Sequence, residues 1–403
     1  MKTVLVVGAG RYQRPVIRKA RDLGLRVVTV DRNPDAPGLA EADVGLVVDF
    51  SSPAAVLEEV RDLGIDGVLT VQAERAVPMI AELAEALGVP GIGVDTARLM
   101  TNKLAMRARL AEAGVPQPRF ATVRTVDEAR AALAEIGVPA VLKPADASGQ
   151  LGVARLRSGD DVHERVAAAL AASPSGQLVL EEYVEGVELN GIVVVQEGEV
   201  LSVTLCDRLR PPGRSFGVSW LHVYPPTPVG AQLAAAERVA AEAVRALGLR
   251  TGIGFPQILA MPDGGVALVE CAARIGGMMG EQMQHALGID LLEVALRLAL
   301  GERVTPELVR ERFRRPVAIR FLTADPGALT PGRVTRIGSL DPVLASPGVL
   351  DASIYSVVGE TIRPVMIISD RRGYVIAEGA TREEAIERAD AAALLVDVEV
   401  EAQ

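Results

Sequence analysis

The chain has 403 residues, enough for roughly two to four domains, and only 3% of them are aromatic, so aliphatic side chains must fill the core. The formal net charge of −10 argues against nonspecific nucleic-acid binding, although a local basic pocket can still hold phosphate. No apolar run reaches the roughly 18 residues of a membrane helix. Cys206 and Cys271 are far apart in the sequence, which does not favour a disulfide framework, and the three histidines are scattered, which does not favour a His-rich metal centre. We therefore expect a cytoplasmic protein without nucleic-acid or membrane partners.

Residues 1–93 alternate between strand and helix patterns. TVLVVGA is a continuous apolar run, typical of a strand buried on both faces. The elements that follow are a helix over 14–23, strand LRVVTVD, a helix over 53–63, strand GVLTV, a helix over 75–87 and strand VPGIG. This alternation predicts a doubly wound parallel sheet.

A glycine-rich turn follows the first strand. Gly8 and Gly10, with Asp31 at the end of the second strand, match part of the dinucleotide fingerprint. The third glycine position, which permits close helix–strand packing, holds Gln13 instead. An NAD-dependent oxidoreductase therefore stays open as an alternative, but we favour a structural or substrate-side turn.

The middle of the chain mixes α and β patterns. Residues 94–117 predict a helix-rich connector, and 118–183 predict a mixed unit with strands at FATV, AVLKP and LVLEEYV and helices over 126–136 and 160–172. Residues 184–303 predict strands at ELNGIVVVQ and VLSVTLCD, a Pro/Gly-rich loop over 210–228, a long helix over 230–247, two strands around PDGG and a helix over 289–300.

From residue 304 onward, short strands and turns such as LTPG, SPG and RRG return. The end of the chain predicts a strand, a loop, a helix capped by Thr381 with acidic residues in its first turn, and a last strand. This region is mostly β.

Two features of the first mixed unit suit phosphate binding. Lys143 ends an apolar strand, where it could neutralise phosphate oxygens as a point charge. The loop DASGQLG follows, and its Gly149 and Gly152 leave backbone N–H groups free to fold over phosphates. Taken singly, a solvated edge lysine and a plain turn explain the same residues.

The segment LVLEEYVEGVELNG carries two acids around a short turn. Glu181 closes one strand and Glu188 begins the next, so they could bond an exocyclic amine and a ribose hydroxyl. The alternative is the charged rim of a hairpin.

The segment GIGFPQILAMPDGGVALVECAARIGG predicts a hairpin with Gln257 and Glu270 on its two strands. That spacing can bring two oxygen ligands side by side, as Mg²⁺ requires. Arg274 could clamp a transferring phosphate or a carboxylate. The alternative is a buried Glu270 paired with Arg274.

In this fixed order, the parts resemble the ATP-grasp superfamily over nearly the whole chain. The resemblance implies a Rossmann-like pre-ATP-grasp domain over 1–93 and an ATP-grasp domain over 94–303, with lobes at about 118–183 and 184–303. AIRFLTADPGALTPGRV and RRGYVIAEGATREEAIERA make residues 304–403 similar to the small C-terminal domain of the biotin carboxylase and glycinamide ribonucleotide transformylase branch.

The resemblance also implies roles for single residues. In the nucleotide site, Lys103 and Lys143 would bind ATP, Ser148 to Gly152 would cover its phosphates, Glu181, Glu182 and the backbone of Val184 would meet adenine, and Glu188 would bind the ribose. Gln257 and Glu270 would hold Mg²⁺, with Mn²⁺ as a second choice, and Arg274 and Lys143 would be catalytic. Two positions depart from the family pattern: Gln257 replaces a common acid, and Ala272 replaces an asparagine that often ligates metal.

The implied reaction is the ATP-dependent activation of a small carboxylate, an amino acid first of all, as an acyl phosphate that an amine attacks. CDRLRPPGRSFGVSWLHVYPP and VECAARIGGMMGEQ look most like bacterial L-amino acid ligases, which would place Glu74, Arg208, Gly276 and Gly277 at the substrate, with His222 and His285 as further lining. Gly8, Gly10 and Arg11 would touch the acid.

Alternatives to this ligase function are a purine-pathway or bicarbonate-activating enzyme and a noncatalytic nucleotide-binding regulator. The family also implies a homodimer as one assembly.

Overall fold

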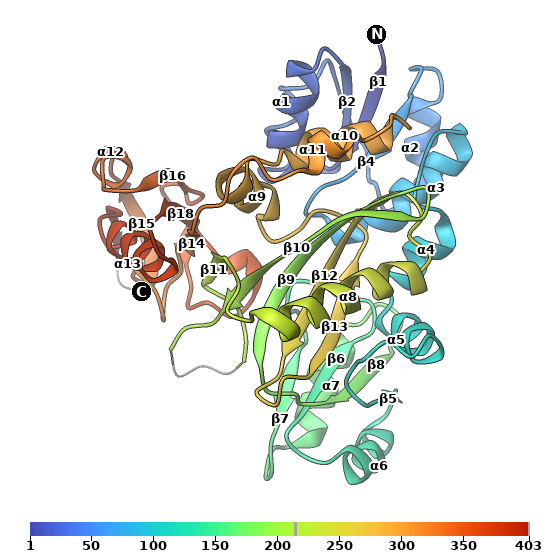
Figure 1. Ribbon diagram of the computed structural model, residues 1–403, viewed down its shortest axis with the longest axis vertical. Helices are drawn as coiled ribbons and strands as arrows, with labels where there is room; N and C mark the ends of the chain where they lie inside the picture. Colours follow the sequence, from blue (N-terminus) through green and yellow to red (C-terminus); the bar gives the residue numbers. More distant parts are fainter. Residues whose placement is uncertain (213–215, 402–403) are drawn as a thin grey trace.

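The computed structural model describes residues 1–212 and 216–401 (Figure 1). Its N-terminal part is a parallel sheet of order β3-β2-β1-β4, made of β1 Thr3–Val7, β2 Arg26–Asp31, β3 Val44–Val47 and β4 Gly67–Leu69. The helices α1 Arg14–Asp22, α2 Pro53–Val60 and α3 Val77–Leu87 and the 3₁₀ turn η1 Glu74–Ala76 belong to the same part. Alternate residues of β1 enter two different cores, which explains its continuous apolar run. The predicted strand VPGIG was wrong, because Pro90 cannot donate to a sheet ladder.

The glycine turn after β1 is packed and hydrogen-bonded by other residues of the N-terminal part. Gly8 has a φ of +92°, and a side chain added there or at Gly10 would meet Gln13 at 3.3 Å. The Nε2 group of Gln13 donates to Val71 O at 2.6 Å. Asp31 accepts the backbone N–H of Ala9 at 2.8 Å, so its carboxylate stabilises the turn. This geometry is that of a structural strand–helix turn.

The mixed unit predicted over 118–183 contains an antiparallel sheet of order β5-β8-β6-β7. Its strands are β5 Phe120–Val123, β6 Ala140–Pro144, β7 Ala154–Leu156 and β8 Leu178–Glu182, with helices α6 Val126–Ile136 and α7 Val162–Ala171 packed on it. The predicted connector forms α4 Val94–Leu99 and α5 Lys103–Glu112.

An eight-stranded antiparallel sheet of order β13-β12-β9-β10-β11-β14-β18-β16 runs through the rest of the molecule. The strands before residue 304 are β9 Val187–Gln196, β10 Glu199–Leu209, β11 Leu221–Tyr224, β12 Gly252–Ala260 and β13 Val266–Ala272, and α8 Gly230–Ala246 lies across them (Figure 1). The predicted loop over 210–228 was partly wrong, because it contains β11; its residues 213–215 lie outside the described part.

The C-terminal strands β14 Val317–Phe321, β16 Val349–Ile354 and β18 Gly373–Glu378 continue this same sheet, since β14 pairs with β11. A separate small sheet, β17-β15-β19, contains β15 Gly332–Ile337, β17 Thr361–Ile362 and β19 Val398–Glu401. The remaining elements are α9 Met279–Leu287, α10 Leu291–Ala299, α11 Pro306–Val309, α12 Asp341–Leu344, η2 Ile368–Asp370 and α13 Arg382–Ala393. Thr381 caps α13 as predicted, through a 3.2 Å bond to the N–H of Glu384.

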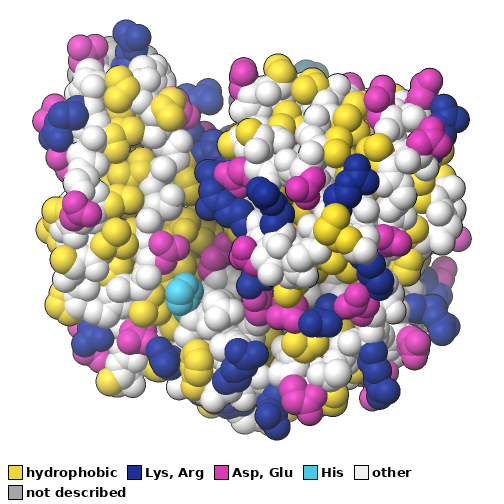
Figure 2. All heavy atoms as spheres, turned by 90° about the horizontal axis from the view of Figure 1, so that it is seen from above, with side chains coloured by type: hydrophobic (Ala, Val, Ile, Leu, Met, Phe, Trp, Pro, Cys, Tyr) yellow, Lys and Arg dark blue, Asp and Glu magenta, His cyan; other side chains and the backbone are white. Residues whose placement is uncertain are grey.

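The N-terminal part and the C-terminal strands lie on either side of a deep hollow, seen from above in Figure 2, with basic side chains gathered along its right-hand rim. Helix α10 packs on α1 and β4, and Lys19 pairs with Asp290 at 2.7 Å, which joins the N-terminal part to the middle of the chain. Across the described ranges, no helix combines the length and apolar character needed to cross a membrane.

Candidate active site

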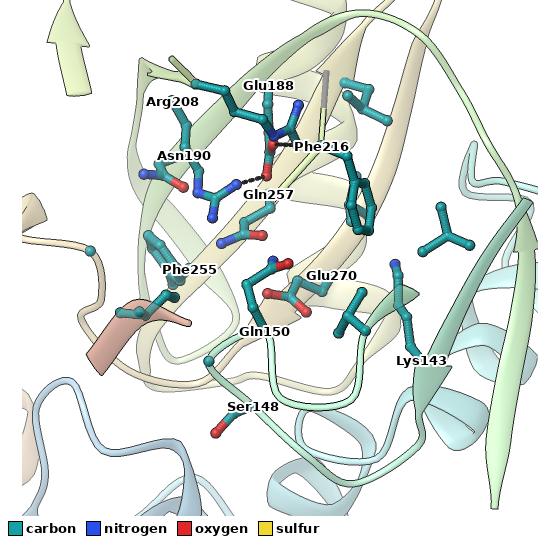
Figure 3. A pocket seen from close by; sticks show the side chains of 18 of the residues that line it. Lys143, Ser148, Gln150, Glu188, Asn190, Arg208, Phe216, Phe255, Gln257 and Glu270 are labelled. Carbon is teal, nitrogen blue, oxygen red and sulfur yellow. Dashed lines mark hydrogen bonds and ion pairs between the residues drawn. The ribbon is translucent and has the colours of Figure 1, made fainter. Parts of the chain in front are cut away.

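A cavity of about 750 Å³ lies where the two lobes, the N-terminal part and the C-terminal strands converge. In Figure 3, Lys143 is on one side of it, Arg208 and Asn190 are on the other, and Gln257 and Glu270 point into the space between. Of the sequence-predicted residues, the cavity is lined by Glu74, Lys103, Lys143, Ser148, Gly149, Glu181, Glu182, Val184, Glu188, Arg208, His222, Gln257, Glu270, Arg274 and Gly277.

The predicted residues Gly152, Gly276 and His285 do not line this cavity, and neither do Gly8, Gly10 and Arg11 of the first turn, which were expected to touch the acid. Gly152 packs on its own lobe, since a Cβ there would meet Ala172 at 2.7 Å. A Cβ at Gly276 would stand 1.9 Å from the guanidinium of Arg274. Gly276 therefore makes room for the side chain of Arg274.

Lys143 and Glu181 form a buried ion pair at the end of β6 and β8, with the Nζ and Oε2 atoms 2.6 Å apart. The other carboxylate oxygen of Glu181 lies 2.8 Å from Arg107, which is 1% exposed. Burial by itself would raise the pKa of Glu181, but Arg107 and Lys143 hold it below its ordinary value. Both oxygens of the Glu181 carboxylate are therefore already paired in this structure.

Arg107 was missed at the sequence level. It lies on α5 and also donates to Leu268 O at 3.0 Å and to Val269 O at 2.6 Å, so it joins the connector to both lobes. Nothing in the pattern KLAMRARLAE separates it from a solvated helix arginine.

We expect Arg107→Met to lower the free energy of unfolding by about 2–3 kcal/mol, because two backbone carbonyls and a buried carboxylate oxygen lose their donor. Chemical denaturation measures this, with Arg109→Met on the exposed face of α5 as the control. Equal stability of the two variants would contradict the structural role of Arg107.

Lys103 joins the connector to the predicted phosphate loop. Asn102 caps α5 by accepting the N–H of Ala105 at 3.0 Å, which places Lys103 in the first turn. The Nζ group of Lys103 donates to Ala147 O at 2.6 Å, one residue before Ser148. The loop itself bends through left-handed conformations, with φ of +71° at Gly149 and +72° at Gln150.

The hairpin predicted for the metal ligands is present. Gln257 on β12 pairs directly with Glu270 on β13, and a register irregularity follows Gln257. Within the described residues, no three His, Cys, Asp or Glu side chains cluster as a metal site. One carboxylate and one amide oxygen that line the cavity fit Mg²⁺, which usually completes its shell with water and phosphate oxygens. Ala272 is buried in the core and adds no ligand.

Arg274 pairs with Glu74, at 2.6 Å between Nη2 and Oε2, and not with Glu270. The pair crosses from the N-terminal part to the segment after β13, and Gln72 N also donates to Ile275 O at 2.9 Å beside it. Glu74 was expected to face a substrate amine; in the structure its carboxylate pairs with Arg274, and its role toward a substrate stays a prediction.

The far end of the cavity is rich in arginine. Arg208 and Arg210 both pair with Glu188, which the sequence had assigned to a ribose (Figure 3). Arg371 donates to Ser219 at 2.6 Å and lies 3.6 Å from the ring centroid of Phe321. Among the described residues, Arg371 has no carboxylate partner and is 6% exposed.

Two polar side chains beside these arginines have unmatched atoms. Within the described residues, Asn190 Oδ1 and His222 Nδ1 are buried without a hydrogen-bond partner. Burial, together with Arg371 and Arg208, lowers the pKa of His222 well below its ordinary value, so its ring is neutral. Asn190, Arg210 and Arg371 were not singled out from the sequence; for Arg371, the motif RRG was interpreted only as a turn.

Family models match three stretches of the chain: "ATP-grasp N-terminal domain" over residues 17–91, "Carbamoyl-phosphate synthase L chain, ATP binding domain" over 102–306 and "L-amino acid ligase C-terminal domain 2" over 320–401. A formate-dependent phosphoribosylglycinamide formyltransferase of Burkholderia thailandensis is 30% identical over 98% of this chain and 94% of its own length. With the cavity described above, these matches define a nucleotide-dependent ligase. The chain belongs to the ATP-grasp superfamily of carboxylate–amine ligases.

Solved structures agree on the fold. An L-amino acid ligase from Bacillus licheniformis superposes with a TM-score of 0.85 at 22% identity, covering 100% of this chain and 99% of that one. The biotin carboxylase domain dimer of a Hydrogenobacter thermophilus 2-oxoglutarate carboxylase, a complex with MgADP, gives 0.78 at 20% identity, covering 99% and 90%. The predicted fold class is confirmed.

Proposed function

We propose that this protein uses ATP and Mg²⁺ to activate a small carboxylate, foremost an amino acid, as an acyl phosphate for attack by an amine, with release of ADP and phosphate. The observation that carries the proposal is one cavity in which two lysines and a glycine loop, a Gln–Glu hairpin and an arginine-rich end follow one another. The lysines and the loop would bind the phosphates, the Gln–Glu hairpin would bind the metal, and the arginines would bind the acid.

At the nucleotide end, the backbone of Val184 and the residues Glu181 and Glu182 would hold the base. Glu188, which pairs with Arg208 and Arg210, would reach the ribose from the arginine-rich side. Lys103 and Lys143 would neutralise the phosphates, and Ser148 and Gly149 would cover them. Lys143 already lies beside Glu181, so its ammonium is held in place before nucleotide arrives. Preorganised charge of this kind stabilises phosphoryl transfer without reorganisation.

Gln257 and Glu270 would hold Mg²⁺, which, when bound, supplies charge neutralisation on the phosphate oxygens. Arg274, fixed by Glu74, would direct the acid and the transferring phosphoryl group. An oxygen of the acid attacks the γ-phosphorus, and the bond to ADP breaks. The amine nitrogen then forms the new bond to the acyl carbon, loses its proton, and phosphate leaves.

Two observations support an amino acid as the carboxylate substrate. The cavity of about 750 Å³ must hold ATP together with both substrates, which leaves room only for small ones. The C-terminal family match and the TM-score of 0.85 are both to L-amino acid ligases. Gly277, Arg208 and His222 would line the substrate end.

A second candidate is a phosphate-bearing amine substrate, as in purine-pathway enzymes. It is favoured by Arg371, which has no carboxylate partner in the described chain, and by the 30% identity to the formyltransferase.

We also propose a cytoplasmic homodimer. The dimer named for the carboxylase neighbour supports the assembly, and light scattering tests it.

An ADP-release screen tests the function. Purified protein with Mg-ATP is offered pairs of amino acids and amines, and formate or bicarbonate with aminoribotides, and products are identified by mass spectrometry. We expect an amide product from an amino acid pair. ADP release only with an aminoribotide would select the second candidate, and no release above background would refute both.

A further inference from the structure

The segment of residues 366–371 reaches from the C-terminal strands into the cavity and touches the predicted phosphate loop. The backbone N–H of Ile368 donates to Gly149 O at 3.2 Å, although the two residues are 219 positions apart. Both residues line the cavity. In Figure 3, a short stretch in the reddish colour of the end of the chain lies beside the loop that carries Ser148 and Gln150.

Asp370 holds this segment in shape. Its Oδ2 atom accepts the backbone N–H groups of Met366 at 3.0 Å and Ile367 at 2.9 Å, and the residue is 5% exposed. Val365 N donates to Ala324 O at 2.9 Å, which ties the start of the segment to the C-terminal part. The N–H of Ile368 is therefore presented to the loop by a fixed support.

Among the described residues, few other hydrogen bonds hold the loop near Gly149. Ala147 O receives Lys103, but Gly149 and Gln150 stand in left-handed conformations, and the bonds inside the loop are long, at 3.4 Å for Leu151 N to Ser148 O. A side chain added at Gly149 would meet nothing within 4 Å. The bond from Ile368 thus fixes the loop from the opposite side of the cavity.

We propose that Ile368 holds the loop closed over the nucleotide phosphates and that Asp370 is the positioning residue for this contact. The inference rests on the proposed function, since it takes residues 148–152 as the phosphate cover. Arg371 extends from the same short segment to the arginine-rich end, so the segment joins the phosphate cover to the acid-binding end.

The structure allows the hydrogen bond to be removed alone. Ile368 is the first residue of η2, a position that tolerates proline, and Ile367 has φ −130° and ψ 166°, which a following proline accepts. Ile368→Pro deletes the N–H, while the 3.2 Å bond from Arg371 N to Ile368 O remains. Ile368→Val removes one carbon, matches proline in side-chain carbon number and keeps the N–H.

Calorimetric titration with Mg-AMP-PNP and with AMP tests the proposal. We expect Ile368→Pro to weaken Mg-AMP-PNP binding about 3- to 10-fold relative to Ile368→Val, with AMP binding unchanged, because one hydrogen bond over the β- and γ-phosphates is lost. Asp370→Ala should act in the same direction.

Equal Mg-AMP-PNP affinity of the proline and valine variants would overturn the inference while leaving the proposed function intact. A loss that is the same for AMP and Mg-AMP-PNP would also overturn it, since such a loss is not specific to the phosphate cover. Absence of Mg-AMP-PNP binding by the unaltered protein would refute the proposed function itself.

Discussion

Glu270→Gln is expected to lower the turnover number of the ligase reaction by about 1,000-fold, since catalysis of phosphoryl transfer depends mainly on charge placed on the phosphate oxygens. Glu270 is the carboxylate of the Gln257–Glu270 pair, and the described residues offer no cluster of further acidic ligands to replace it. Glutamine keeps the shape and one oxygen but removes the charge.

The measurement is ADP release at saturating ATP, repeated over a range of Mg²⁺ concentrations. Glu242→Gln is the matched control: it is an exposed acid on α8, the helix that covers the opposite face of the hairpin. Both variants should keep the thermal midpoint of the parent. Full activity of Glu270→Gln at low Mg²⁺ would show that the metal lies elsewhere.

Arg274→Lys is expected to lower kcat/KM for the acid by about 100- to 1,000-fold, although the positive charge is kept. Lysine lacks the planar fork that binds a carboxylate or phosphate through two parallel bonds. It would also lose the fixed orientation that the 2.6 Å contact with Glu74 gives.

Glu74→Gln separates orientation from charge. It leaves Arg274 in place but weakens its anchor, so we expect a smaller fall of about 10-fold, mostly in KM for the acid. Steady-state kinetics with the acid varied at saturating ATP measure both variants. An Arg274→Lys variant with unchanged constants would mean that this arginine does not meet the acid.

Local spacing was enough to predict the parts of the site that lie on one hairpin or one strand end. Gln257 and Glu270 face each other because a short turn between two strands determines which residues pair. Lys143 was predictable from a different local signal. The apolar run of β6 ends at this lysine, and Lys143 lines the cavity.

Contacts between distant segments could not be predicted in this way. Glu74 and Arg274 are 200 positions apart, and Glu181 meets Arg107 of the connector helix α5, so no local pattern shows which carboxylate pairs with which arginine. Glu188 likewise proved to pair with Arg208 and Arg210. The roles of these residues in the reaction stay predictions.

The fold shows the same limit. Helix α9, which begins at Met279 shortly after the glycines 276–277, was missed because its first turn follows residues typical of a loop. The pairing of β11 with β14 carries one sheet across residue 304, and strand pairing over almost 100 residues depends on tertiary packing. The domain boundaries at 93 and 303 also stay predictions.

The central claim is that the acid becomes an acyl phosphate. It is tested most directly by running the reaction with an acid labelled with ¹⁸O in both carboxylate oxygens and analysing the released phosphate by mass spectrometry. The account predicts one labelled oxygen in each phosphate, because the acid oxygen that attacks the γ-phosphorus leaves with it. Phosphate without label, at the same yield of amide, would contradict the account.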